Sequence, residues 1–173
     1  AAGAVIHGTG TSRMDHLGGL IKRMPRTGIC FAAGSAAISG LPPFNGFLGE
    51  FLIFLSALFG ITTMILPLSL CSVTVIISLG LIGGLATACF TKVFGTVFLG
   101  EPRSGEHNHA KDPDSRMTIP MYVLALLCLL IGLSGSSVIV MACTAVSVVS
   151  GLSTEACAAG LRTASYPLTA ISM

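Results

Sequence analysis

The sequence predicts an all-α protein, a polytopic transmembrane helix bundle fragment with one discontinuous helix. Three observations predict this class. Hydrophobic residues make up 53% of the 173 residues and charged residues only 9%, whereas ordinary soluble domains are about 25% charged. Long apolar runs alternate with two short charged loops. One apolar run is interrupted by the adjacent prolines Pro42 and Pro43, and prolines break helices because they lack the N–H donor.

The composition also excludes several classes of protein. The net charge is only +2, and the basic residues cluster in loops instead of forming a stripe, so nucleic acid is not an expected partner. The six cysteines show no C-x-x-C spacing, and most lie in apolar runs, where cysteine behaves as a small hydrophobe. We therefore expect neither a metal nor a cofactor in this chain. The cysteines are Cys30, Cys71, Cys89, Cys128, Cys143 and Cys157.

Residues 1–173 are expected to form a single membrane domain. Residues 1–9 have the character of the last turns of an apolar helix that begins before residue 1, which predicts the C-terminal part of a longer membrane protein. The absence of a basic n-region argues against a signal peptide.

The apolar run at residues 28–60 allows two architectures. Its halves are too short to span separately, because a full crossing needs about 20 residues. It is either one broken transmembrane helix or a hairpin of two short helices. Loops 10–27 and 100–117 both carry Lys and Arg, and cytoplasmic loops carry such an excess. A single broken crossing places both loops on the cytoplasmic side of the cell membrane, and we favour it.

Two further spans and a tail complete the domain. Residues 65–98 and 118–143 are each long enough to cross a bilayer with some tilt. Residues 144–173 are small and weakly polar, and the sequence predicts either a short outer-side helix or a tail there.

Glu50 is the leading candidate for a functional residue. Between Thr27 and Gly100 only Glu50 and Lys92 carry charge at neutral pH. A carboxylate in such a setting costs roughly 2.5–3.5 kcal/mol on insertion scales, so it is retained for function by default. The alternative is an interfacial helix residue that reaches water.

The predicted helix break is a chemical feature as well. Pro42, Pro43, Asn45 and Gly46 interrupt the helical pattern just before Glu50. Broken helices form ion sites in transporters. The N-terminal dipole of the second half-helix favours the anionic form of Glu50, while apolar surroundings favour the neutral form. A carboxyl group under these opposing influences is suited to exchanging a proton.

Four histidine and lysine positions need separate interpretations. Lys92 either faces the bundle interior as a proton carrier or extends its ammonium to the interface. His7 is either a proton relay or a residue at the end of a helix. His107 and His109 resemble a short metal-binding tract, but their charged loop favours solvated side chains.

Three segments carry a resemblance to a known family: GAVIHGTGTSRMDHLGGLIKRMP, AISGLPPFNGFLGEF and FTKVFGTVFLG. They resemble the C-terminal part of the antiporter-like membrane subunits. Such subunits occur in proton-pumping NADH:quinone oxidoreductase (complex I), Mrp-type antiporters and energy-converting nickel–iron hydrogenases. The details, among them MDHLGGLIKRMP and KVFGTVFLGEPRS, look most similar to the large membrane subunit of formate hydrogenlyase-type hydrogenases.

The resemblance implies roles for individual residues. The family fold has two inverted repeats, each with one broken helix, and residues 28–60 match the second of these. Glu50 matches a position where members carry a key Lys or Glu of the proton path. Lys92 matches a basic position in the following helix, and His7 lies near the histidine-containing end of the preceding one.

The function implied is that of a proton-translocating subunit of a redox-driven complex. Flavin, iron–sulfur or nickel–iron centres are expected in partner subunits, both membrane and peripheral. NADH dehydrogenase (ubiquinone) activity with ATP synthesis coupled electron transport, or hydrogenase activity, is expected of the complex, in the cell inner membrane. The alternatives are an Mrp-type cation/proton antiporter subunit and a structural membrane fragment without transport activity.

Overall fold

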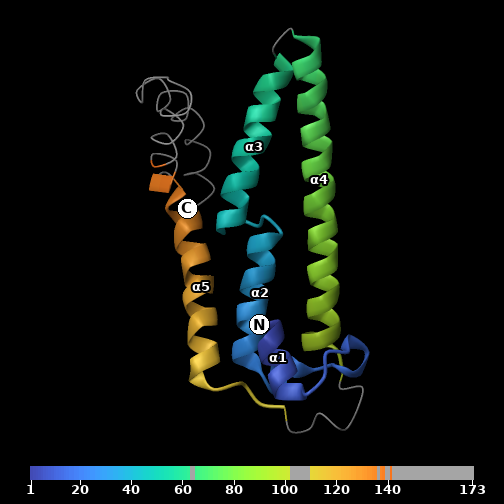
Figure 1. Ribbon diagram of the computed structural model, residues 1–173, viewed down its shortest axis with the longest axis vertical. Coiled ribbons are helices and arrows are strands. Elements are labelled where there is room, and N and C mark those ends of the chain that lie inside the picture. Colours follow the sequence, from blue (N-terminus) through green and yellow to red (C-terminus); the bar gives the residue numbers. More distant parts are fainter. Residues whose placement is uncertain (63–64, 102–109, 136, 139–140, 142–173) are drawn as a thin grey trace. The chain divides into compact units, whose positions relative to one another are not determined.

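The computed structural model describes residues 1–62, 65–101, 110–135, 137–138 and 141, and the regular elements in these residues are all helices (Figure 1). Two single-turn 3₁₀ helices lie in the first charged loop, and a π-helical turn follows the longest helix. The predicted all-α class is confirmed. The α-helices are α1 Ala2–Thr9, α2 Pro25–Ile38, α3 Asn45–Thr62, α4 Leu66–Phe94 and α5 Ser115–Leu133; the 3₁₀ helices are Met14–His16 and Leu20–Lys22, and the π turn is Gly95–Leu99.

Three of the described helices are long and apolar enough to cross a bilayer. They are α3, α4 together with its π turn, and α5, with mean hydropathies of 1.5, 2.2 and 2.0. In the most apolar stretch of each helix, no more than 11% of the residues are buried inside the chain. A helix that is apolar on all sides is typical of a membrane span. The chain is therefore a multi-pass membrane protein whose apolar side chains are available to lipid or to other protein.

The helices extend over the expected spans with shifted ends. The expected span at 65–98 contains α4 and most of the π turn. The expected span at 118–143 begins three residues earlier, at Ser115, and its regular helix ends at Leu133. The expected tail at 144–173 lies outside the described residues, as do His107 and His109.

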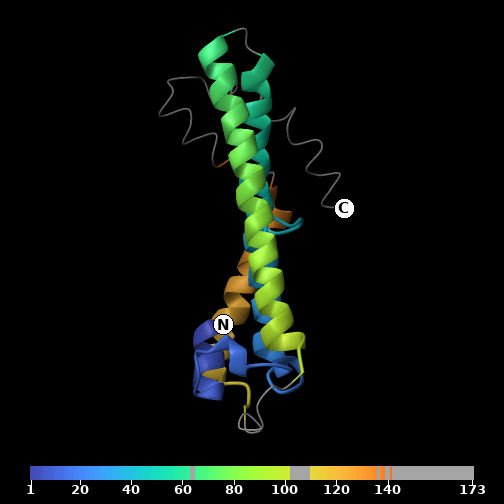
Figure 2. The same ribbon diagram turned by 90° about the vertical axis from the view of Figure 1, so that its right-hand side faces the viewer.

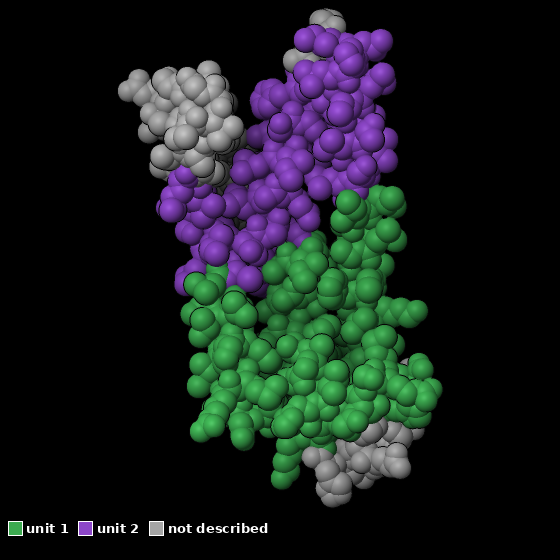
Figure 3. All heavy atoms as spheres, in the orientation of Figure 1, with its two compact units in different colours: residues 1–39, 81–127 green, residues 40–80, 128–173 purple. Residues whose placement is uncertain are grey.

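The chain divides into two compact units, which are coloured separately in Figure 3. The first unit comprises Ala1–Ser39 and Leu81–Leu127, and the second comprises Gly40–Gly80 and Cys128–Met173. The boundary at residue 40 separates α2 from α3, and both α4 and α5 contribute residues to each unit.

The first unit has a small apolar core at the base of α2. Helix α1 lies beside the beginning of α2 in two perpendicular views (Figures 1 and 2). Phenylalanine rings from α2 and from the end of α4 pack together here, with Phe31 and Phe94 at 5.3 and 5.4 Å from Phe98 between ring centroids. Phe98 is almost fully buried. The remaining buried core residues are Val5, Leu17, Leu20, Met24, Val97 and Ala110.

The N-terminus of α2 is held by a residue from the second charged loop. Pro25 occupies the first turn of α2, where its missing N–H costs nothing. The backbone N–H groups of Arg26 and Thr27 each donate a hydrogen bond of 3.2 Å to the Asp112 carboxylate, and the Thr27 hydroxyl donates a third of 3.0 Å. These are the free donors that a helix N-terminus leaves unpaired. Asp112 therefore caps a helix that begins far earlier in the chain.

The C-terminus of α2 follows from the residues after it. Helix α2 ends at Ile38, and the N–H of its C-cap residue Ser39 donates to the Ser35 carbonyl at 2.9 Å. Gly40 then adopts φ +63°, in the left-handed region. Glycine is the usual residue after a C-cap because it enters this region without a Cβ clash.

A short turn separates α2 from α3. Pro42 and Pro43, joined by a cis peptide bond, lie in this turn, and proline disfavours helical geometry in the residue before it. The Phe44 N–H donates to the Leu41 carbonyl at 3.0 Å. Asn45 is the first residue of α3, so the helical pattern resumes two residues after the proline pair.

Candidate functional site

Glu50 lies in the second turn of α3 and is half-buried. It is the only charged residue among the 18 residues of this helix. Side chains in an α-helix lean toward the helix N-terminus, and the Glu50 side chain accordingly reaches back to the turn that precedes α3. Its carboxyl group packs against Gly40. The helix break and the candidate carboxyl group thus form one local structure.

Gly40 provides the space that the carboxyl group occupies. A Cβ atom at this position would lie 2.9 Å from Glu50 Cδ and 3.2 Å from Oε1, and it would also collide with Oε2. Weak Cα–H···O contacts are a recurring feature of such close approaches. The absence of a side chain at Gly40 therefore has two consequences. It permits the left-handed backbone conformation, and it leaves room for the Glu50 carboxyl group.

Helix α5 packs directly onto the same turn. A Cβ atom at Gly132 would collide with the Pro43 carbonyl oxygen and would lie 2.6 Å from the carbonyl carbon of Phe44. One turn later, a Cβ at Gly135 would lie 3.2 Å from the Leu48 side chain. Gly132 in α5 and Gly135 just after its end let the backbone approach the break closely, as small residues do between membrane helices.

Lys92 is exposed on α4 and lines a cavity of about 310 Å³ in the first unit. Asp15, from the first charged loop, lines the same cavity, which therefore presents one basic and one acidic side chain. Thr96 donates its hydroxyl to the Lys92 carbonyl at 2.9 Å. The other lining residues are Met14, Cys89 and Val93.

His7 lies in the last turn of α1 and is exposed. Its neighbour Ile6 and the neighbour of Lys92, Val93, line a common apolar cavity of about 210 Å³. His7 and Lys92 thus belong to the first unit, whereas Glu50 belongs to the second. The roles predicted for these three side chains stay predictions.

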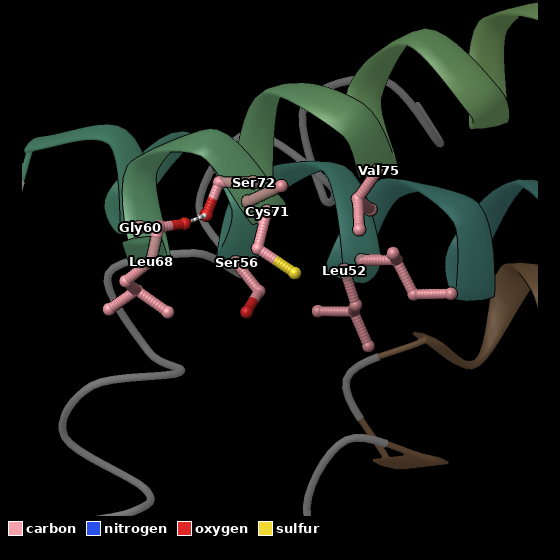
Figure 4. Close-up of a pocket in the computed structure, with 9 residues that line it drawn as sticks. Leu52, Ser56, Gly60, Leu68, Cys71, Ser72 and Val75 are labelled. Carbon is pink, nitrogen blue, oxygen red and sulfur yellow. Dashed lines mark hydrogen bonds between the residues drawn. The ribbon is translucent and has the colours of Figure 1, made fainter. Parts of the chain in front are cut away.

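The second unit also contains an apolar groove of about 590 Å³ between α3 and α4. Figure 4 shows Leu52 and Ser56 of α3 on one wall of the groove and Cys71, Ser72 and Val75 of α4 on the other. The two helices approach closely at its end, because a Cβ at Gly60 would collide with the Ser72 hydroxyl. Among the described residues, its lining carries no Asp, Glu, Lys, Arg or His side chain.

Metal binding finds no geometric support in the described part of the chain. No three His, Cys, Asp or Glu side chains come together there in a group that could hold an ion.

Sequence reasoning missed four residues that the structure brings to these places. Gly40 had a recognisable signal, since a glycine before a Pro-Pro pair is typical of a helix end. Gly132 carried only the weaker signal of a small residue in an apolar run. Asp15 and Asp112 had none, because the Lys92 that shares a cavity with Asp15 and the Thr27 that bonds to Asp112 are remote in the chain.

The fold and the site define a class before any comparison: a multi-pass α-helical membrane protein with a carboxyl group at a helix break. Residues 1–78 match the family described as NADH:quinone oxidoreductase/Mrp antiporter, TM. The chain belongs to this family of antiporter-like membrane subunits, and the resemblance predicted from its motifs is confirmed.

Three relatives illustrate the family. Hydrogenase-4 component B of Escherichia coli (strain K12) is 40% identical over 136 residues, which are 78% of this chain and 20% of the relative. Formate hydrogenlyase subunit 3 of the same organism is 34% identical over 133 residues, 77% of this chain and 22% of the relative. A Na(+)/H(+) antiporter subunit of Bacillus subtilis (strain 168) is 33% identical over 139 residues, 76% of this chain and 24% of the relative. The chain thus spans less than a quarter of the length of each of these relatives.

Proposed function

We propose that this chain is part of a proton-translocating, antiporter-like subunit of a redox-driven membrane complex, and that Glu50 is its exchangeable proton site. The observation that carries the proposal is the Glu50 carboxyl group, which lies at a helix break inside an otherwise uncharged span. Ionisable residues inside membrane spans mark ion and proton pathways. The relatives named as components of hydrogenase-4 and of formate hydrogenlyase support a redox-driven complex.

The redox chemistry belongs, in this proposal, to partner subunits. Membrane and peripheral partners would carry flavin, iron–sulfur or nickel–iron centres, and this chain would bind lipid and protons. The family description names NADH:quinone oxidoreductase, and two relatives are named as hydrogenase or formate hydrogenlyase components. We favour the hydrogenase branch over NADH dehydrogenase activity with ATP synthesis coupled electron transport.

Lys92 and His7 are proposed as further protonatable groups on the path. Support for Lys92 comes from its cavity, which it shares with the acidic side chain of Asp15.

The membrane orientation is proposed from a contact within the first unit. Thr27, at the end of loop 10–27, donates hydrogen bonds to Asp112 of loop 100–117. Two loops in direct contact lie on the same side of a bilayer. Because their Lys and Arg residues indicate the cytoplasmic side, we place both loops there, in the inner membrane. This arrangement requires that residues 28–60 cross once, as a broken helix.

Replacement of Glu50 by Gln tests the proposed function. The variant keeps the size of the side chain and removes its titration, so proton translocation per electron in the assembled complex should fall at least about tenfold, the loss expected from removing one positioned proton carrier. Electron transfer and assembly are measured beside it, with Gly49→Ala as a control one residue away. An unchanged ratio of protons to electrons would exclude Glu50 as the exchangeable site.

A second candidate function is that of an Mrp-type cation/proton antiporter subunit. The Bacillus subtilis relative, named as part of a Na(+)/H(+) antiporter, favours it. Na⁺-dependent proton movement in vesicles without any electron donor would support this function, and its absence would leave the redox-driven hypothesis. Normal transport by a complex that lacks residues 1–173 would instead indicate a structural role.

A further inference from the structure

We propose that Gly40 is a positioning residue for the Glu50 carboxyl group, so that the turn ending one helix sets the place of the proton-carrying group of the next. The proposal rests on the proposed function and deepens it. It names a residue outside α3 that acts on the proton site through direct contact.

Glu50 and Gly40 are in direct contact. The Glu50 carboxyl group fills the space beside the Gly40 Cα atom, where every other residue type carries its Cβ. The atoms in conflict would be the far end of a flexible side chain. An added Cβ would therefore displace the carboxyl group, because a side-chain rotation costs less than a backbone shift.

Backbone contacts hold the turn that contains Gly40 in place. Gly132 of α5 lies against the Pro43 carbonyl and the Phe44 backbone, and these contacts are between backbone atoms. The turn is also constrained by the hydrogen bond from the Phe44 N–H to the Leu41 carbonyl. The turn cannot easily retreat from an added methyl group, so the carboxyl group must move instead.

Proton transfer depends on the position of the Glu50 carboxyl group. A proton donor or acceptor must lie within hydrogen-bond reach of its partner, about 2.6–3.2 Å between heavy atoms or through one water. A displacement of about 1 Å from a reacting group can cost about 100-fold in rate. Moving the carboxyl group by the width of a methyl group therefore disturbs transfer without removing the titratable group.

The test compares Gly40→Ala with Gly49→Ala in the full-length protein, within its membrane complex. Gly49 is the matched control because it lies beside Glu50 in α3 and a Cβ there meets no atom within 4 Å. Two quantities are measured: protons translocated per electron, and the infrared carbonyl band of protonated Glu50, assigned by its loss in Glu50→Gln. Gly40→Ala should shift the band and lower translocation at least about fivefold, as expected for a misplaced reacting group. Gly49→Ala should change neither.

A second variant separates the carboxyl contact from the backbone conformation. Asparagine enters the left-handed region more easily than alanine but still carries a Cβ atom. Gly40→Asn should therefore shift the carbonyl band of Glu50 away from its position in the unmodified protein. This result also tests the proposal if Gly40→Ala fails to assemble. Recovery of the native band and of translocation in Gly40→Asn would overturn the positioning role and leave only a backbone requirement.

A rescue experiment completes the test. Glu50→Asp shortens the side chain by one methylene and withdraws the carboxyl group from residue 40. Combined with Gly40→Ala, it should recover translocation relative to Gly40→Ala alone. Failure of rescue together with a native band in Gly40→Ala would overturn the proposal. If Glu50→Gln leaves translocation intact, the proposed function fails; if Gly40→Ala merely equals Gly49→Ala, only the positioning role fails.

Discussion

At the scale of single residues, hydrogen bonds satisfy the buried polar side chains of the part of the chain that the structure describes. Only a few described polar side chains are buried: Thr27, Ser72 and Thr118. Each donates its hydroxyl within the protein, to Asp112, to the Leu68 carbonyl and to the Pro113 carbonyl respectively. Thr27 differs from the other two because its partner lies 85 residues away in the sequence. The Thr27–Asp112 contact is thus a polar link between the two charged loops.

Removal of the Asp112 carboxylate should destabilise the first unit. Asp112→Ala leaves two N–H groups of α2 and the buried Thr27 hydroxyl without their acceptor. Loss of a helix cap costs about 0.5–2 kcal/mol, and an orphaned buried group costs about 1–3 kcal/mol. Thermal unfolding of the purified complex in detergent should show a lower midpoint for Asp112→Ala than for the unmodified complex.

Two further variants make that measurement specific. Asp114→Ala is the control, because Asp114 contributes its backbone carbonyl to Met117 and Thr118 and alanine retains this carbonyl. Thr27→Val removes the hydroxyl while keeping the side-chain volume. The effects of Asp112→Ala and Thr27→Val should be less than additive when combined, as for residues in direct contact. Full additivity would show that the two side chains do not interact.

At the scale of elements, the helix break is a packed structure rather than a gap. Glu50 of α3 contacts the turn through Gly40, and α5 contacts it through Gly132. The carbonyl groups that proline leaves without partners are tolerated in a membrane only where protein or a water-filled cavity covers them. Close packing by α5 provides part of that cover.

Gly132→Ala should disturb the break through backbone contacts. The new Cβ would collide with the Pro43 carbonyl oxygen, and backbone atoms cannot rotate away as a side-chain tip can. Overpacking of this kind costs about 1–3 kcal/mol. The fraction of complex that survives heating in detergent should fall, whereas Gly34→Ala should leave it unchanged because a Cβ there has open space. Equal survival of the two variants would contradict the observed packing of α5 on the turn.

The helices of this chain were predictable because each leaves a local trace in the sequence. Apolar runs predicted α3, α4 and α5, and the Pro-Pro pair predicted the interruption. It lies at residues 39–44, whereas Asn45 and Gly46 of the predicted break belong to α3. The candidate site was predictable only in part. Glu50 is conspicuous because charge is rare between residues 28 and 99. The contact with Gly40 depends on how the turn folds back, and the Asp112 cap depends on tertiary structure, so neither follows from periodicity or composition.

At the scale of the whole molecule, the exposed apolar side chains of α3, α4 and α5 fit a protein surrounded by lipid and by other helices. The chain spans 20% of the length of hydrogenase-4 component B and 22% of formate hydrogenlyase subunit 3. The exposed apolar surface of this chain is available for contact with lipid or with other protein.

The orientation of this chain in the membrane can be measured with single cysteines introduced into a cysteine-free background. Lys22→Cys and Lys111→Cys place a thiol in each charged loop, and both positions are exposed. Ile65→Cys places an exposed thiol between α3 and α4. A membrane-impermeant thiol reagent added to the cytoplasmic face of inverted vesicles should label residues 22 and 111 together and leave residue 65 unlabelled. Intact cells should show the reverse pattern, because a single broken crossing separates residue 65 from both loops. Labelling of residues 22 and 111 from opposite faces would mean that residues 28–60 cross twice, and the proposed orientation would then be wrong.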